Sequence, residues 1–235
     1  MRLGIMQPYF FPYIGYMSLI KNTDLFILFD DVQFIRHGWI ERNRILKPSG
    51  GWQYIAVPLE KHNRDTLIKE IRINNETDWK TKLKAQLGHY KKAPYYWKVM
   101  KVLDEIFADN YEDIVTFNQV SLQKICEYLQ INTPIQISSR MNLSYEPAEE
   151  ADEWALNICK AIEGADEYWN PIGGMSFFDR EKYTSEGIDI KFMDMDLKEY
   201  PQFQNEFEPG LSILDVMMFN SVEKINQMLE GYHLL

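Results

Sequence analysis

The chain has 235 residues, of which 46% are hydrophobic and 14% aromatic, and this composition suffices for one large core. Its formal net charge is −10 and its sequence pI is about 5.0. This acidic balance argues against broad, sequence-independent binding to nucleic acid, which needs a dense basic surface, but it leaves room for a local basic pocket that binds a phosphate.

The first thirty residues predict a strand, a turn, a helix and a second strand. Residues 3–6 form a short apolar run, and Pro8 and Pro12 prevent a helix from starting before the one expected at 13–21. Residues 25–29 are apolar at every position, which is typical of a central parallel strand buried on both faces. A right-handed crossover places both strands in one sheet.

The next segment predicts an antiparallel ribbon that projects from the sheet. Residues 32–45 alternate between apolar and polar types, residues 48–51 form a Pro-Ser-Gly-Gly turn, and residues 52–58 are extended. We therefore assign residues 32–60 to the ribbon and expect one further strand at 68–73.

Three helices are expected after the ribbon. Asp78 is a suitable N-cap for the first, Pro94 suits the first turn of the second, and the third spans residues 113–129. Because no linker separates these helices from their surroundings, we predict a helical lobe at 78–130, inserted into a single α/β domain of residues 1–235.

In the rest of the chain, predicted strands and helices alternate. Strands are expected at 135–138, 167–169 and 188–193, and helices at 149–162, 211–219 and 222–229. Ser212 or Gly210 is a possible cap for the helix at 211–219, and Ser221 for the last helix. The alternation predicts an open, mostly parallel sheet.

The cysteines and the N-terminus indicate where the protein works. Cys126 and Cys159 have no close spacing and fall on apparent helix faces, so we expect buried free thiols rather than a disulfide or a zinc site. Residues 1–6 run directly into Gln7-Pro8, which does not resemble a signal peptide. No apolar run is long enough to cross a bilayer. A cytoplasmic protein is predicted.

Polar residues follow four of the predicted strands, at the edge where open α/β sheets bind ligands. In chain order they are Gln7, Asp30 and Asp31, Ser138 to Arg140, and Asn170 with Gly173 and Gly174. Because the carboxyl ends of parallel strands meet at one edge, these residues are expected to converge on one site.

Each of these polar groups has a functional and a structural interpretation. Gln7 can form hydrogen bonds with a polar group of a ligand, or it can stabilise its own turn. Asp30 and Asp31 can bind a metal, act as a base or bind ribose hydroxyls; alternatively, they cap the strand or pair with Arg42 or Arg44. Neighbouring strand residues point to opposite faces, so one of the two is expected to face the site.

Positive charge gathers at Arg36, Arg42 and Arg44 in an otherwise acidic chain. Arginine matches phosphate and carboxylate groups, so the segment predicts a site for a nucleotide or sugar phosphate; the alternative is a solvated ribbon face. His37 is the histidine best placed for proton transfer. Asp215 lies one turn into a predicted helix and is expected to cap or to pair.

The predicted site residues form two groups. The catalytic group is Asp30, Asp31 and His37. The substrate-binding group is Gln7, Tyr9, Phe11, Tyr16, Gln33, Arg36, Trp39, Arg42, Asn43, Arg44, Asn170, Gly173 and Gly174. No metal site is predicted. The chain lacks G-x-S-x-G, Walker and G-x-G-x-x-G motifs, so the sequence indicates no particular cofactor. It also indicates no particular oligomeric state.

These segments, in this order, resemble the WbqC-like family of bacterial proteins. The resemblance covers nearly the whole chain and is carried by residues 7–16 (QPYFFPYIGY), 30–34 (DDVQF), 38–40 with 42–44, 92–95 (KAPY), 164–168, 173–174 and 207–215. It implies a role in the synthesis of surface polysaccharide or O-antigen. The implied substrate is a nucleotide-linked or lipid-linked sugar, and the implied reaction is N-acyl or aminoacyl transfer to an amino sugar.

The opening layout also resembles the nucleotidyltransferase superfamily that carries a His-x-x-His or His-x-Gly-His signature. That resemblance implies a Rossmann-like, nucleotidyltransferase-like scaffold. Residues 11–16 read Phe-Pro-Tyr-Ile-Gly-Tyr and contain tyrosines where the signature has histidines, so the phosphate chemistry of that signature does not carry over.

Three functions are therefore compared. The first is a transferase acting on a nucleotide-linked amino sugar, a small-molecule substrate. The second is a nucleotidyltransferase-like enzyme or ATP-dependent ligase. The third is a non-catalytic scaffold or regulator encoded in a glycan gene cluster, in which the many aromatic residues form a protein interface.

Overall fold

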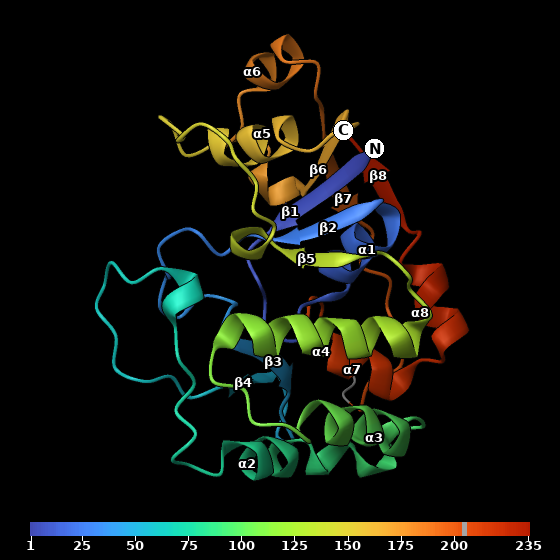
Figure 1. The fold of residues 1–235 in the computed structure, drawn as a ribbon. Coiled ribbons are helices and arrows are strands. Elements are labelled where there is room, and N and C mark those ends of the chain that lie inside the picture. The colour runs from blue at the N-terminus through green and yellow to red at the C-terminus, as the bar shows by residue number, and fades with distance from the viewer. Residues whose placement is uncertain (204–205) are drawn as a thin grey trace.

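The computed structural model of the protein describes residues 1–203 and 206–235 and has a six-stranded sheet at its centre (Figure 1). Its strands are β1 (Arg2–Met6), β2 (Leu25–Leu28), β5 (Ile135–Ile137), β6 (Glu167–Pro171), β7 (Asp189–Met195) and β8 (Tyr232–Leu234). They lie in the order β5-β2-β1-β6-β7-β8, and all neighbours are parallel except β7 and β8. Numbered along the chain, this is the 3-2-1-4-5-6 order of a Rossmann-like sheet, which confirms the predicted fold class.

Helices cover both faces of the sheet (Figure 1). One layer contains α1 (Ile14–Asn22), α4 (Ile114–Leu129), α7 (Ile213–Phe219) and α8 (Val222–Met228), and the opposite face carries α5 (Glu153–Lys160) and α6 (Arg180–Ser185). Beyond the first layer lie α2 (Trp79–Gln86) and α3 (Tyr96–Ile106). Short 3₁₀ turns complete the fold: η1 (Ile68–Glu70), η2 (Gly88–Lys92), η3 (Ser138–Arg140) and η4 (Ile172–Gly174).

The two faces of the sheet pack into two cores. In β2, Phe26 and Leu28 belong to the larger core, which also contains residues of the ribbon and of α2 to α4, whereas Ile27 belongs to a smaller core shared with α5. All three side chains are fully buried. The expected central strand, buried on both faces, is therefore confirmed.

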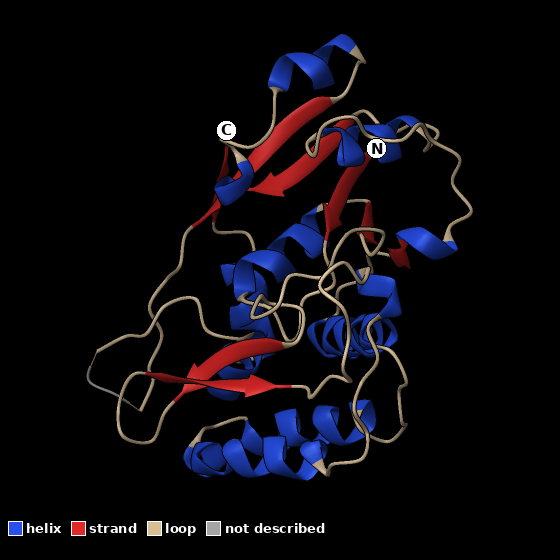
Figure 2. Ribbon diagram, turned by 90° about the vertical axis from the view of Figure 1, so that its left-hand side faces the viewer, coloured by secondary structure: helices blue, strands red, loops and turns tan. Residues whose placement is uncertain are grey.

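The antiparallel ribbon consists of β3 (Arg42–Leu46) and β4 (Trp52–Ala56). It lies apart from the six-stranded sheet, on the side of α2 and α3 (Figure 2). The extended strand expected over 32–45 is correct only from residue 42 onward. Gln33 forms an isolated antiparallel bridge with Leu67, and residues 36–41 form turns, in which the carboxylate of Glu41 accepts a hydrogen bond from the backbone N–H of His37 at 2.6 Å.

The strand expected at 68–73 is wrong, because this segment begins with the 3₁₀ turn η1. Ile68 and Ile71 are both fully buried, and their three-residue spacing suits a helical turn. The carboxylate of Glu70 accepts a hydrogen bond from the N–H of Leu67 at 3.2 Å, which closes the turn. Two elements, α6 and β8, were not expected from the sequence.

Helix ends agree with the expected caps. Asp78 accepts from the N–H of Thr81, Ser212 from that of Leu214 and Ser221 from that of Lys224. Other boundaries shift: the helix expected at 149–162 is shorter, as α5, and the helix expected to include Pro94 in its first turn begins two residues later, as α3.

Both cysteines are buried free thiols, as expected, and burial raises the pKa of each to about 12. In the described part of the chain, no helix is both long enough and apolar enough to cross a bilayer.

Candidate functional site

A cavity of about 670 Å³ opens at the carboxyl ends of β1 and β6. These neighbouring strands mark the point where the strand order changes direction, because the chain builds outward to β2 and β5 on one side and to β7 on the other. Open α/β sheets bind ligands in the crevice at such a switch point. Gln7, directly after β1, and Asn170, within β6, both line this cavity.

The strand–turn–helix segment at residues 7–16 builds one wall of this sheet-edge cavity. The hydroxyl of Tyr16 donates to the carbonyl oxygen of Gln7 at 2.8 Å, and the ring of Tyr9 stacks on Tyr16 with centroids 5.3 Å apart. Gly15 lets the ring of Tyr13 lie close to the helix, since a Cβ there would come within 2.5 Å of that ring. Tyr9 and Tyr13 line the cavity, whereas Tyr16 is fully buried behind them.

The turn itself contains a strained residue held by distant side chains. Phe11 has a φ of 38°, in the left-handed region that non-glycine residues rarely adopt. Its carbonyl oxygen accepts hydrogen bonds from Nδ2 of Asn43 at 3.0 Å and from the hydroxyl of Ser212 at 2.7 Å. Phe11 is fully buried, so it shapes the turn from inside the core and does not line the cavity.

The opposite wall contains an amide whose orientation is fixed. The hydroxyl of Tyr168 donates to the carbonyl oxygen of Ile5 at 3.3 Å, so it accepts from Nδ2 of Asn170 at 2.6 Å. Oδ1 of Asn170 is therefore turned the other way, next to Gly174, where a Cβ would lie only 2.2 Å from it. This oxygen accepts no hydrogen bond from the described residues and is free to accept one from a ligand.

A smaller cavity of about 260 Å³ continues the first one, because Tyr9, Tyr13 and Trp39 line both. Arg44 lines the smaller cavity, with its guanidinium carbon 5.5 Å from the ring centroid of Trp39 and 5.2 Å from that of Trp52. Its Nη2 donates to the carbonyl oxygen of Gly210 at 3.3 Å. Among the described residues, no charged side chain lines the larger cavity, and Arg44 alone brings a charge to the smaller one.

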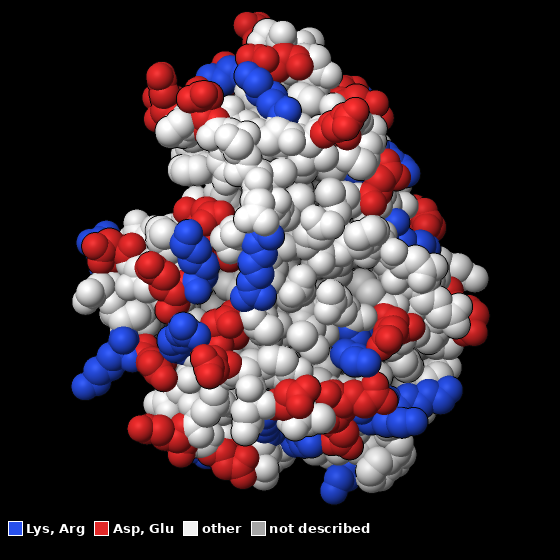
Figure 3. All heavy atoms as spheres, viewed as in Figure 1, with Lys and Arg blue, Asp and Glu red and all other residues white. Residues whose placement is uncertain are grey.

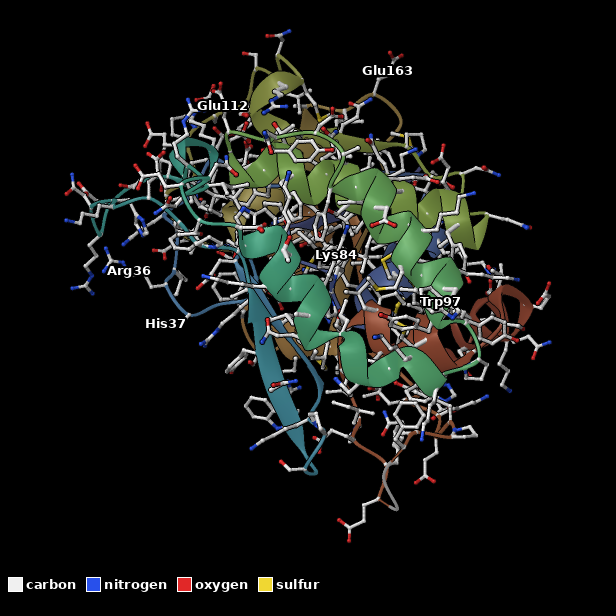
Figure 4. All side chains as sticks on the ribbon, turned by 90° about the horizontal axis from the view of Figure 1, so that it is seen from below. Arg36, His37, Lys84, Trp97, Glu112 and Glu163 are labelled. Atoms are coloured by element: carbon white, nitrogen blue, oxygen red, sulfur yellow. The ribbon has the colours of Figure 1, made fainter. Side chains whose placement is uncertain are left out.

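Arg36, His37 and Arg42 lie elsewhere, around a third cavity of about 720 Å³ formed by residues 34–42 and 54–62. Figure 4 labels Arg36 and His37 at one edge of the molecule, beside the ribbon. The guanidinium carbon of Arg42 lies 4.1 Å from the ring centroid of Tyr54. The predicted arginine segment is therefore divided between two cavities.

Asp30 and Asp31 meet the end of β5, as the strand-edge argument expects, but they line none of the three cavities described above. Asp30 is buried, and its carboxylate accepts from the hydroxyls of Ser138 and Ser139 at 2.8 and 2.7 Å and from the N–H of Ser139 at 3.1 Å. Asp31 pairs with Lys69 at 2.8 Å. These contacts tie β2 to β5. The described residues contain no group of three or more His, Cys, Asp or Glu side chains arranged to hold a metal ion.

The sequence prediction thus places seven residues around the sheet-edge cavity. They are Gln7, Tyr9, Gln33, Trp39, Asn170, Gly173 and Gly174. It missed several aromatic residues that complete the walls: Tyr13, Trp154, Tyr168, Phe177 and Phe178. Tyr13 stands in the same motif, two residues before Gly15, and could have been found there. Tyr168 stands in a predicted strand and in the segment 164–168 that carries the family resemblance, whereas Trp154, Phe177 and Phe178 come from segments with no local signal for a cavity.

The sheet order defines an α/β protein of Rossmann-like layout with a cavity at its switch point. The chain belongs to the WbqC-like protein family, whose family model matches residues 7–227. It is also 32% identical over 223 residues, 93% of each chain, to a protein of Mycobacterium tuberculosis (strain ATCC 25618 / H37Rv) named Uncharacterized protein Rv1507c. No solved structure matches the chain significantly.

Proposed function

We propose that this protein is a transferase that acts on a nucleotide-linked amino sugar in bacterial surface-polysaccharide (O-antigen) synthesis, by N-acyl or aminoacyl transfer. The observation that carries the proposal is the continuity of an uncharged sheet-edge cavity with a smaller cavity that ends at Arg44. Such a site suits a ligand with a neutral, hydroxyl-rich part and one anionic part.

The larger cavity has the chemistry expected for the sugar. Its volume of about 670 Å³ falls within the usual range for small-molecule sites. Gln7 can donate and accept hydrogen bonds, and Oδ1 of Asn170 can accept one from a hydroxyl or amine. The rings of Tyr9, Tyr13 and Trp39 offer flat apolar faces with polar edges.

The phosphates of the ligand would then lie toward Arg44. Its guanidinium is held by two rings and one carbonyl oxygen, and it forms no ion pair with a carboxylate of the described residues, unlike Arg2, Arg72 and Arg140. A charge that is fixed but unpaired is ready for charge-assisted hydrogen bonds to phosphate. The backbone amides of Gly173 and Gly174 offer a second approach for an anion.

The proposal assigns Asp30 a structural role, since its carboxylate is already satisfied by three hydrogen bonds. Asp31 and His37 stay candidates for proton transfer, although neither lines the sheet-edge cavity. Figure 3 shows a largely uncharged surface below α5, whereas acidic and basic residues lie above it and are interspersed lower on the same face. A cavity of about 670 Å³ also supports a ligand-binding role over a purely scaffolding one.

The first experiment measures binding and turnover with uridine or thymidine diphosphate-linked amino sugars. We expect wild-type protein to bind them, and Arg44→Gln to weaken binding about tenfold, or about 1.4 kcal/mol. Arg180→Gln is the matched control, because the guanidinium of Arg180 also packs on a ring, that of Phe192 at 5.0 Å, but lines none of these cavities. Its affinity is expected to match wild type.

Turnover distinguishes the three functions. A mass increase of the sugar nucleotide in the presence of acyl-thioester or aminoacyl donors supports the transferase. Release of pyrophosphate from ATP or CTP with magnesium would favour the nucleotidyltransferase or ligase instead. Binding to no sugar nucleotide, together with no chemical change, would overturn the proposal in favour of a non-catalytic role.

A further inference from the structure

We propose that the third cavity, between residues 34–42 and 54–62, is a separate site for a second, phosphate-bearing organic molecule. This ligand is distinct from the one in the sheet-edge cavity. The cavity measures about 720 Å³, so it has room for a small-molecule group. Its binding needs no sugar nucleotide, so it can be tested independently of the proposed transferase activity.

Two guanidinium groups line this cavity and are held in place without carboxylate partners. Nη2 of Arg36 donates to the carbonyl oxygen of His62 at 2.8 Å, and Nη2 of Arg42 donates to that of His37 at 2.5 Å. Neither arginine forms an ion pair with an Asp or Glu of the described chain, although the protein carries a net charge of −10. Each keeps further N–H donors for a ligand.

The surrounding contacts fix these cations in advance. Arg42 lies over the ring of Tyr54, and Nε of Arg36 donates to Nε2 of His62 at 3.3 Å while Nδ1 of His62 lies 2.9 Å from the carbonyl oxygen of Glu60. The contacts of His62 thus join the two loops that form the cavity. Pre-positioned donors lose less side-chain freedom on binding.

The balance of charge favours an anionic ligand. Arg36, Arg42 and Lys61 supply three cations, against the carboxylates of Glu41 and Glu60. Glu41 is buried, and its carboxylate is partly satisfied by the N–H of His37. Burial raises the pKa of Glu41, against the opposing effects of its backbone hydrogen bonds and of Arg42. Two arginine forks that line one cavity match a phosphate group.

The remaining walls are apolar and indicate that the phosphate belongs to an organic molecule. Phe34, Val57 and Leu59 line the cavity beside the cations, and Phe34 and Val57 are buried. A free inorganic ion would leave these walls uncovered, whereas a phosphate ester would contact them. A transferase needs two substrates, so a phosphate-bearing group donor is the natural occupant if the proposed function is correct.

The test uses inorganic pyrophosphate and adenosine diphosphate as probes, by calorimetry at physiological salt. We expect adenosine diphosphate to bind more tightly than pyrophosphate, and Arg36→Gln and Arg42→Gln each to weaken both at least about tenfold. Arg64→Gln removes the same charge from an exposed arginine nearby that does not line the cavity, and its affinity is expected to stay within about twofold of wild type. Arg44→Gln is also expected to stay within about twofold.

Several results would overturn this proposal. The first is that neither probe binds to wild type. The second is that Arg64→Gln weakens probe binding as much as the cavity variants do, which would indicate general attraction to charge. The third is that only Arg44→Gln weakens probe binding. Competition between the probes and a bound sugar nucleotide would show that one ligand spans both cavities, which also refutes a second molecule. Arg36 is exposed, so Arg36→Gln is expected to fold normally, and its thermal unfolding checks this.

Discussion

Two buried asparagines hold the turn that follows β1, and neither donates to the solvent. Nδ2 of Asn43 donates to the carbonyl oxygens of Phe10 and Phe11 at 3.1 and 3.0 Å. Nδ2 of Asn118, in α4, donates to those of Pro8 and Ile40 at 2.8 and 2.9 Å. Each amide thus replaces regular backbone pairing in a segment that has none. These hydrogen bonds fix the shape of the cavity wall.

Neighbouring glycines at the cavity provide a residue-scale prediction. In Gly174→Ala, the new Cβ would lie 2.2 Å from Oδ1 of Asn170, so the Asn170 side chain must turn away. We expect affinity for the amino-sugar nucleotide to fall about five- to tenfold, the value of one hydrogen bond of about 1 kcal/mol or slightly more. The melting temperature is also expected to fall slightly, because turning the Asn170 side chain breaks its buried hydrogen bond to the hydroxyl of Tyr168.

Gly173→Ala is the matched control for this change. A Cβ at Gly173 meets no atom within 4 Å, and this residue is not among those with a positive φ. Both its affinity and its melting temperature are expected to equal those of wild type. Equal affinities for the two alanine variants, measured by calorimetry, would show that Asn170 does not contact the ligand.

At the scale of elements, a buried carboxyl joins α7 to the segment that borders the smaller cavity. Asp215 accepts hydrogen bonds from the hydroxyls of Tyr90 and Tyr200 and from Nε2 of Gln202. The same segment carries Gly210, which receives the hydrogen bond from Arg44. The structural role expected for Asp215 from the sequence agrees with these contacts.

Asp215 predicts a pH dependence of stability. Burial raises its pKa from 3.8 to about 6, against the opposing effect of its three donors. The folded protein therefore binds the proton of the Asp215 carboxyl more tightly than the unfolded chain does. The contribution of this protonation to the free energy of unfolding is complete below about pH 3.8 and is lost as the pH rises through about 6. A shift of about two pKa units corresponds to about 3 kcal/mol.

Asp215→Asn is neutral at every pH and lacks this dependence. We expect the free energy of unfolding of wild type, minus that of the variant, to fall by about 3 kcal/mol between about pH 4 and pH 7 in urea titrations. Asp65→Asn, at an exposed position, provides the control and is expected to give a flat difference. A flat difference for Asp215→Asn as well would mean that its carboxyl is not destabilised by burial.

The elements that could be predicted from the sequence are those with a strong local signal. β2 was evident from its continuous apolar run, and the caps at Asp78 and Ser221 from residue type. Residues 32–41 alternate like a strand, yet residues 36–41 form turns that include the hydrogen bond from the N–H of His37 to the carboxylate of Glu41. Such a contact competes with strand pairing and leaves no trace in the periodicity.

The site was predictable where it depends on strand ends and not where it depends on tertiary contacts. Gln7 and Asn170 were found because they lie at strand ends. Asp30 satisfies the same rule, but Ser138 and Ser139 occupy its carboxylate, a fact that only the pairing of β2 with β5 reveals. Trp154 reaches the cavity from α5, and no spacing in the sequence relates it to β1.

For the whole molecule, the continuity of the larger core bears on how many units fold. This core contains Leu28 of the sheet, Ile45 of the ribbon and Leu103 of α3 together. Elements that share one core lose their contacts together when any part unfolds. The single domain predicted over residues 1–235, with an inserted lobe at 78–130, therefore implies one cooperative unfolding transition.

Two truncations of buried side chains test this prediction, one in the lobe and one on the opposite face of the sheet. Leu103 lies in α3 and is fully buried, and Leu156 lies in α5 within the smaller core. Leu103→Ala and Leu156→Ala are each expected to cost about 2–5 kcal/mol and to lower the same transition, followed by circular dichroism and tryptophan fluorescence. If the lobe folded on its own, calorimetry would resolve two transitions, and Leu103→Ala would shift only one of them.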